Sequence, residues 1–304
     1  MLADEAEVNR GVDFVGIGVS AVPQPEKGTA VTVNVLPGTP AEVSGLRPHD
    51  SLLAADGLPI VGGERIFLER LRGPECTAVV VTVQSPGQPP RDLTIVRARY
   101  SGPQPIIAEL VATADGARVG YLFLPTFLDE SIDDQVREAL ETWGPLHGLI
   151  VDNRMNGGGL GTIAEALLGF FTAGTVGDFV TVDGREPWDI LADPIHNSQE
   201  VPLVVLVGEE TTSYAEIFTG VLQSLGRASV VGQRTTGNVE QLHLFEFEDG
   251  SRVWLAAATF SPALSEADWE TDGIVPDLEV VAAWDSFTYE TDPGIAAALT
   301  LLGH

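Results

Sequence analysis

The stretch from Val204 to Phe218, VVLVGEETTSYAEIF, contains the transition that decides the fold. Its first four residues are apolar and rich in valine, which is typical of a buried strand. A polar turn follows, and apolar residues then recur at helical spacing. Ser213 therefore stands where a strand end leads into a helix, near free N–H groups that favour negative charge. Nucleophile elbows use this arrangement, although a helix N-cap is the simpler interpretation of Thr212 or Ser213.

A second stretch, Leu149 to Leu160, reads LIVDNRMNGGGL and predicts another strand, a glycine turn and the opening of a helix. Three consecutive glycines allow the backbone to approach a ligand and to direct its N–H groups outward. Such a turn is suited to an oxyanion hole. Strands alternating with helices along this region predict a mostly parallel sheet with crossover helices.

Together the two stretches resemble the C-terminal processing peptidases, also called tail-specific proteases, which are relatives of the tricorn core protease. The resemblance implies an α/β peptidase core that is ClpP- or crotonase-like. It implies that Ser213 is the nucleophile and that the oxyanion donors are the N–H of Tyr214 and that of Gly158 or Gly159. The segment Asp272-Gly273-Ile274-Val275-Pro276-Asp277 matches the family near the end of this core.

Asp152, Arg154 and Asn156 stand at family positions that shape the glycine turn. A buried ion pair or cap explains these residue types equally well. We therefore treat them as supports of the turn.

The N-terminal part resembles a PDZ domain through PGTPA at 37–41 and GLRPHDSLL at 45–53. The resemblance implies a β-sandwich or barrel-like domain in which Gly16, Ile17 and Gly18 form the carboxylate-binding loop. In such a loop, backbone N–H groups cap a peptide C-terminus while the peptide adds a strand to the domain. A glycine turn at a strand start is the alternative.

The chain is expected to divide into an N-terminal tail (1–11), the PDZ domain (12–99), a linker and strand (100–117), the serine peptidase core (118–283) and a C-terminal helix (284–304). Within these parts, the pattern predicts a helix at 63–71 and a partly irregular loop at 184–200. It also predicts a hairpin of 242–247 with 252–258 at an edge of the core sheet.

One position departs from the family. The general base is usually a lysine between two glycines, and Asn238 stands at that position here. An amide cannot take a proton at neutral pH. Lys27 is the only lysine in the chain and belongs to the PDZ region. The usual Ser–Lys pair therefore cannot form.

A histidine is the first alternative base, since relatives in the tricorn branch use one and imidazole suits proton transfer near neutral pH. His243 is nearest in sequence to the expected base loop, and Glu240 could orient its ring. However, residues three apart face opposite sides of a regular strand, so a bulge would be required. His196 is another candidate, and a histidine in an upstream segment is a third. A surface position is the simpler interpretation of each histidine.

Two further functions stay open. A catalytically impaired pseudoprotease would bind peptide C-termini without cleaving them, with Asn238 as a replacement that no longer supports proton transfer. A hydrolase of another acyl substrate ranks last, because the PDZ-like part points to peptide C-termini.

The charge and cysteine content of the chain narrow the classes of partner and cofactor that we expect it to bind. The 304 residues carry a formal net charge of −28, which argues against nucleic acid and anionic membrane surfaces as partners. A single cysteine, Cys76, excludes an internal disulfide. No metal-ligand spacing of histidine or cysteine is present, so no metal or other cofactor is expected. We see no signal-peptide pattern and no long apolar run; the resemblance nevertheless implies an exported protein, periplasmic or extracellular.

Overall fold

The computed structural model describes residues 14–63, 65–101 and 104–304 and contains two compact units. Unit 1 comprises the chain up to Pro105 together with 282–293, and unit 2 comprises 106–281 and 294–304. The expected tail (1–11) lies outside the described residues. The expected boundaries differ most at the C-terminal end, where 282–293 returns to unit 1 instead of joining a terminal helix.

Unit 1 is built on a sheet of short antiparallel strands in the order β2-β3-β4-β8-β9, with β5 beside β4. Two small pairs accompany it, β1 with β10 and β6 with β7. Its elements are β1 (Phe14–Gly16), β2 (Val19–Gln24), β3 (Thr29–Val35), α2 (Pro40–Val43), β4 (Ser51–Ala55), β5 (Leu58–Pro59), β6 (Val61–Gly62), β7 (Arg65–Ile66), η1 (Leu68–Arg70), β8 (Ala78–Gln84), β9 (Arg91–Val96) and β10 (Ala98–Tyr100).

The segment 282–293 is fastened to unit 1 by side chains. It contains the 3-10 turns η2 (Trp284–Ser286) and η3 (Tyr289–Thr291). The Trp284 indole donates to the Thr32 carbonyl at 3.1 Å and stacks on the His49 ring at a centroid distance of 4.2 Å. The Lys27 ammonium donates to both Asp285 carboxylate oxygens, at 2.6 and 2.8 Å.

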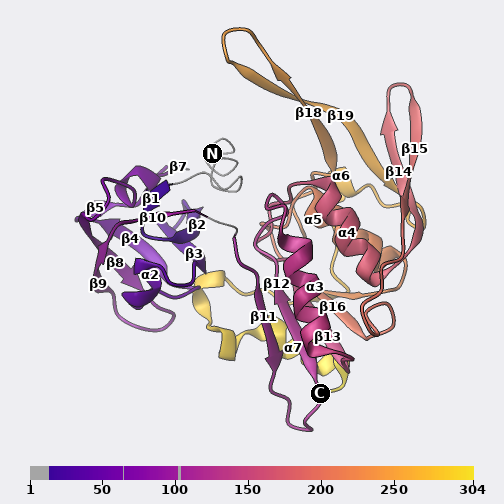
Figure 1. Cartoon of the computed structure of the whole chain (residues 1–304), viewed down its shortest axis with the longest axis horizontal. Helices are drawn as coiled ribbons and strands as arrows, with labels where there is room; N and C mark the ends of the chain where they lie inside the picture. The colour runs from indigo at the N-terminus through magenta and orange to yellow at the C-terminus, as the bar shows by residue number, and fades with distance from the viewer. Residues whose placement is uncertain (1–13, 64, 102–103) are drawn as a thin grey trace. The chain divides into compact units, whose positions relative to one another are not determined.

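Unit 2 contains a six-stranded sheet in the order β11-β12-β13-β16-β17-β20 (Figure 1). Only β11 is antiparallel to its neighbour, and the expected mostly parallel sheet is thus present. The strands are β11 (Ile107–Val111), β12 (Val119–Phe123), β13 (Gly148–Asp152), β16 (Leu203–Val207), β17 (Ser229–Gly232) and β20 (Leu278–Glu279). Every residue of β12, β13 and β16 is buried, as expected for central strands of a parallel sheet.

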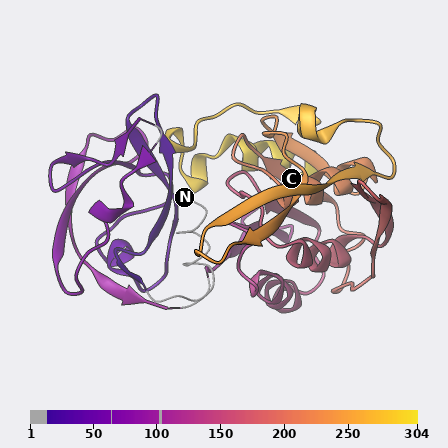
Figure 2. The same ribbon diagram turned by 90° about the horizontal axis from the view of Figure 1, so that it is seen from above.

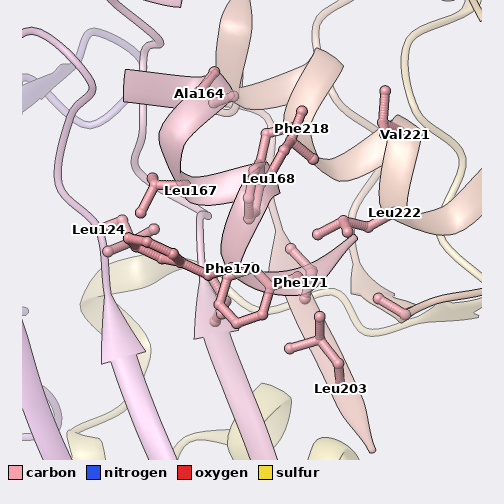
Figure 3. Close-up of a cluster of buried hydrophobic side chains, with 14 of the residues drawn as sticks. Leu124, Ala164, Leu167, Leu168, Phe170, Phe171, Leu203, Phe218, Val221 and Leu222 are labelled. Carbon is pink, nitrogen blue, oxygen red and sulfur yellow. The ribbon is translucent and has the colours of Figure 1, made fainter. Parts of the chain in front are cut away.

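The helices of unit 2 are α3 (Ile132–Trp143), α4 (Gly161–Phe171), α5 (Tyr214–Ser224), α6 (Trp269–Asp272) and α7 (Pro293–Leu302). Helices α4 and α5 supply most of the residues labelled in Figure 3, among them Phe170, Phe171 and Phe218, and Leu203 of β16 belongs to the same cluster. Phe171 and Phe218 pack edge to face at 6.3 Å. Burying these rings fixes α5, and with it the residue that precedes the helix, against the sheet.

A second sheet in unit 2 has the order β15-β14-β19-β18. Its strands are β14 (Gly174–Thr181), β15 (Gly184–Ile190), β18 (Glu240–Glu246) and β19 (Arg252–Pro262). We call the hairpin of β18 and β19, residues 240–262, the arm. Figures 1 and 2 both show it as a long two-stranded ribbon.

Three local expectations were wrong. The described residues of the expected helix at 63–71 do not form one, because Arg65–Ile66 pairs with Val61–Gly62 and a single 3-10 turn follows. The expected loop at 184–200 begins with a strand, β15, whose Trp188 is buried against Phe260. The arm belongs to the second sheet and not to the parallel one.

Candidate functional site

The Ser213 loop and the glycine turn lie at the same edge of the parallel sheet. They follow β16 and β13, which pair directly with Asp152 opposite Leu206. A Cβ built on Gly158 would lie 2.7 Å from the Cβ of Ser213 and 2.8 Å from the carbonyl oxygen of Thr212. The Thr212 N–H donates to the Asn156 carbonyl at 3.1 Å. The two stretches that the sequence singled out are therefore in contact, and the contact leaves no room for a side chain at position 158.

Ser213 has an unusual backbone, with φ 59° and ψ −132°. A positive φ costs a residue with a Cβ of the order of 1–3 kcal/mol, so surrounding contacts must hold it there. Tyr214 begins α5 directly afterwards, which makes Ser213 the N-cap residue as well. The backbone thus combines a cap with a sharp strand-to-helix turn.

The amides around Ser213 differ in their availability. The Gly158 N–H donates to the Asn156 side-chain oxygen at 2.9 Å and is therefore occupied. Within the described parts of the chain, no hydrogen bond is recorded from the N–H of Gly159 or of Tyr214. An isolated bridge between Phe127 and Gly159 also holds the turn, since Phe127 N donates to the Gly158 carbonyl at 2.8 Å.

A buried polar network supports the glycine turn. Asp152 accepts from the Tyr121 hydroxyl at 2.7 Å and from Arg154 Nε at 2.9 Å, and the carboxylate is fully buried. Asn153 extends the network to α5 by donating to the Ala215 carbonyl at 3.0 Å. The expected supporting role of these residue types matches their contacts, because a paired buried charge fixes the path of the chain that carries it.

Glu216 is a residue that the sequence analysis did not single out. Its carboxylate is fully buried and accepts five hydrogen bonds: from Thr212 Oγ1 at 3.5 Å, Ser213 N at 3.1 Å, Thr235 Oγ1 at 2.5 Å, Gly237 N at 2.8 Å and Asn238 N at 2.9 Å. It therefore joins the Ser213 turn to the loop that carries Asn238. The spacing Ser-x-x-Glu from 213 to 216 is a capping-box signature and would have indicated this residue.

The Tyr214 side chain points into an aromatic cluster. Its ring lies 6.2 Å from those of Phe179 and Trp188, and its hydroxyl accepts from Gln241 Nε2 at 3.2 Å. Burial raises the pKa of the Tyr214 phenol above its usual value of 10. The hydrogen bond between Gln241 and Tyr214 thus connects the first turn of α5 to the start of β18.

The structure does not bring either candidate histidine into a recorded contact with Ser213. His243 is exposed on the arm, where its ring packs 4.8 Å from that of Phe245. A bulge interrupts the pairing of β18 with β19 beside Gln241. The extra residue, Ala257, is on β19 and not on β18, so Glu240 and His243 still face opposite sides of their strand.

His196 lies at the opposite edge of the parallel sheet. Its Nε2 is 3.4 Å from the Glu141 carbonyl, and the neighbouring Asn197 accepts from the N–H of Leu146, just before β13 begins. Ser213 follows the other end of β16, and a five-residue strand spans about 16 Å. Across the described residues, no hydrogen bond is recorded between the Ser213 hydroxyl and an imidazole, a lysine or a carboxylate.

The loop expected to bind a carboxylate lies in unit 1. Gly18 has φ 90°, and a Cβ there would lie 2.5 Å from that of Thr39. The Ile17 carbonyl accepts from Ala41 N at 3.0 Å and from the Tyr100 hydroxyl at 3.3 Å. Gly16 pairs with Ala98. The carbonyl of this loop is thus fixed by the protein itself.

The described residues contain no group of three or more histidine, cysteine or acidic side chains placed to hold a metal ion. None of the described helices combines the length and the apolar character that crossing a membrane requires.

Comparison with known proteins gives consistent matches. The model of peptidase family S41 matches residues 118–280. The carboxyl-terminal-processing protease of Synechocystis sp. is 32% identical over 302 residues, which cover 95% of this chain and 69% of that protein. The chloroplastic carboxyl-terminal-processing peptidase 3 of Arabidopsis thaliana is 29% identical over 305 residues, covering 94% and 57%. Among solved structures, the photosystem II D1 C-terminal processing protease superimposes with a TM-score of 0.61 at 25% identity, covering 100% of this chain and 80% of that one.

Proposed function

We propose that this chain, which belongs to peptidase family S41, is a serine-type endopeptidase with Ser213 as its nucleophile. The observation that carries the proposal is the strained backbone of Ser213 at the start of α5, pressed against Gly158. A structural N-cap needs no positive φ, because cap residues ordinarily have extended backbone. A nucleophile presented on a sharp strand-to-helix turn does need such a conformation.

In the proposed reaction the Ser213 Oγ attacks the carbonyl carbon of a peptide bond. The N–H groups of Tyr214 and Gly159 stabilise the oxyanion, since Gly158 N is engaged with Asn156. One preorganised donor of this kind contributes about 10²–10³ in rate. Collapse of the intermediate expels the amine and leaves an acyl-enzyme, which water then hydrolyses.

The proposed substrate is a polypeptide cleaved near its C-terminus. The Synechocystis and Arabidopsis relatives bear the name of carboxyl-terminal-processing enzymes, and the loop Gly16-Ile17-Gly18 of unit 1 is proposed to take the terminal carboxylate in the manner of a PDZ domain. The same family likeness supports export from the cytoplasm as the setting of the reaction.

The test is cleavage of an unfolded polypeptide with a free C-terminus, compared with the same chain amidated at its C-terminus. The proposal expects products trimmed near the C-terminus by the wild type and none by Ser213→Ala. The matched control is Ser224→Ala, which changes a serine at the far end of α5 and should leave cleavage intact. Equal cleavage by wild type and Ser213→Ala would contradict the assignment.

A specific observation favours a second candidate, a non-catalytic peptide-binding relative. The backbone of Asn238, the residue that we assign to the family's lysine position, is held by the Glu216 carboxylate that also holds Ser213. Loss of the base from such a centre typically costs about four to six orders of magnitude in turnover. A chain that binds peptide C-termini but forms no acyl-enzyme would establish this candidate.

A further inference from the structure

The strained backbone of Ser213 needs contacts on both sides to hold it. A φ of 59° is unfavourable for a residue with a Cβ and persists only where its neighbours impose it. Upstream, the Thr212 N–H is bonded to the Asn156 carbonyl. Downstream, we propose that the Tyr214 ring is a positioning group, which holds Ser213 in this conformation and keeps the Tyr214 N–H directed at the oxyanion. The inference rests on the proposed function, because it assigns what fixes one of the two oxyanion donors.

The direction of the Tyr214 N–H follows from the peptide bond that contains it. The Ser213 carbonyl accepts from the N–H groups of Glu216 and Ile217, at 2.9 and 3.1 Å, so it points along α5. In a trans peptide the C=O and N–H point in opposite directions, and the Tyr214 N–H therefore points out of the N-terminal end of the helix. A Cβ built on Gly158 would lie 3.1 Å from this nitrogen. The donor thus lies beside the glycine turn.

The Tyr214 side chain is held by four other elements at once. Its ring lies 6.2 Å from the ring of Phe179 in β14 and 6.2 Å from that of Trp188 in β15. Its hydroxyl accepts from Gln241 of β18. A Cβ on Gly161, the first residue of α4, would lie 2.7 Å from the hydroxyl oxygen, so the lack of a side chain there makes room for the ring. Only 9% of Tyr214 remains exposed.

The rings around Tyr214 are themselves fixed. Phe179 and Trp188 lie 5.4 Å apart, and they pack against Phe260 of β19 at 5.3 and 5.8 Å. Phe260 in turn stacks on Trp269 of α6 at 5.8 Å. Aromatic pairs at these separations stabilise a core beyond the area that they bury, and close-packed interiors resist the displacement of one member. The Tyr214 ring is therefore locked to the second sheet.

A locked ring at position 214 restricts the backbone of the residue before it. Peptide planes are rigid, so Ser213 can relax only by rotation about its own φ and ψ and those of its neighbours. Such a rotation moves the chain after Ser213 relative to the chain before it, and here both sides are held. The next large side chain that anchors α5 in the core is Phe218, one turn further on. Removal of the ring would release the start of α5, and the Tyr214 N–H would leave the oxyanion position.

A positioning role and a purely structural role differ in what they change. A ring that served only the core would affect stability in the same way as any other buried ring of unit 2. A ring that directs an oxyanion donor affects an interaction that forms only in the transition state. Its loss should therefore lower kcat and kcat/KM together on a peptide substrate and leave KM unchanged.

The first test compares rates of labelling by a fluorophosphonate on the folded full chain. Tyr214→Ala should lower the rate at least about tenfold and up to the 10²–10³ that one oxyanion donor contributes. Tyr214→Phe keeps the ring and should recover most of this loss. The control is Trp143→Leu, which removes a buried ring at the end of α3, before β13 begins, and should lower the urea midpoint but not the rate. Labelling of Tyr214→Ala at the wild-type rate, or an equal loss in Trp143→Leu, would overturn the proposal.

The second test needs no activity. Ser213→Gly and Ser213→Ala are compared by urea unfolding, first with Tyr214 present and then in a Tyr214→Ala background. With the ring present, glycine should give the higher midpoint, because it adopts a positive φ without strain. Without the ring alanine can relax, and the difference should vanish; an equal difference in both backgrounds would overturn the proposal.

Failure of the proposed function gives a different result. A folded wild type that the fluorophosphonate does not label would refute Ser213 as an activated nucleophile. The comparison of glycine with alanine at position 213 would still decide whether the Tyr214 ring holds the strained backbone.

Discussion

Replacing Asn238 by lysine should create a base for Ser213. The Ser213 and Asn238 amides donate to the same Glu216 oxygen at 3.1 and 2.9 Å, so these two nitrogens lie at most about 6 Å apart. A lysine side chain of four methylenes spans about the same length and ends in an amine whose pKa falls readily on partial burial. Asn238 is exposed, so the longer side chain can be accommodated without repacking the core.

The expected magnitude follows from what a positioned base contributes. General base catalysis supplies about 10²–10⁴ in rate, or about 2.7–5.4 kcal/mol of barrier at 1.36 kcal/mol per decade. We therefore expect Asn238→Lys to label with a fluorophosphonate at least about a hundredfold faster than its parent. The parent for this comparison is the otherwise unchanged chain.

The assay is the second-order labelling rate by intact mass, measured from about pH 6 to pH 10. The rate of Asn238→Lys should rise with pH as the amine loses its proton. Asn238→Met, which has a similar length and no amine, is the matched control and should label no faster than the parent. Equal labelling rates for the lysine and methionine variants, with both folded, would mean that a side chain at position 238 does not reach the Ser213 hydroxyl.

Three further predictions concern supports of the fold and of the site. Gly158→Ala should abolish labelling and lower the free energy of unfolding by about 1–3 kcal/mol, because its Cβ would lie 2.7 Å from the Cβ of Ser213 and its backbone has φ +83°. Gly157→Ala is the matched control: a Cβ there meets nothing within 4 Å, so labelling and stability should both be unchanged. Glu216→Gln should cost about 1–3 kcal/mol in urea unfolding and slow labelling, because the single oxygen of an amide cannot accept from all five donors that the carboxylate serves; an unchanged urea midpoint would contradict this. The hydrogen bond from His304 lowers the pKa of Asp115 from 3.8 to about 2. Because the folded state then binds this proton less tightly than the unfolded state, the carboxylate stabilises the fold above about pH 4. This contribution is lost as the pH falls through about 2. Asp115→Asn should therefore lower the urea midpoint at about pH 5 and match the wild type near pH 2, and a difference that does not change with pH would refute the linkage.

The parallel core could be predicted because its signals are local. The valine-rich run before Ser213 and the apolar run before the glycine turn are buried strands, and topology alone brings the ends of adjacent parallel strands to one edge. The contact between Gly158 and Ser213 is a direct consequence. The helices α3 and α7 also follow their apolar spacing.

Other features depend on tertiary contacts that no local pattern contains. The sequence from 63 to 71 has helical spacing, yet Arg65 and Ile66 form a strand that pairs with Val61 and Gly62. The arm alternates like any hairpin, and its membership in the second sheet is decided by pairing with β14, more than seventy residues earlier in the chain. His243 is close in sequence to the loop that carries Asn238, yet it lies on the exposed arm, because β18 extends away from that loop.

Whether the Ser213 hydroxyl is an activated nucleophile can be measured by its labelling with a fluorophosphonate. The full chain, beside Ser213→Ala and the control Ser224→Ala, is incubated with the probe and read by intact mass. We expect one adduct on the wild type and on the control, and none on Ser213→Ala. An adduct that persists in Ser213→Ala, or no adduct on the folded wild type, would contradict the assignment of Ser213 as the nucleophile.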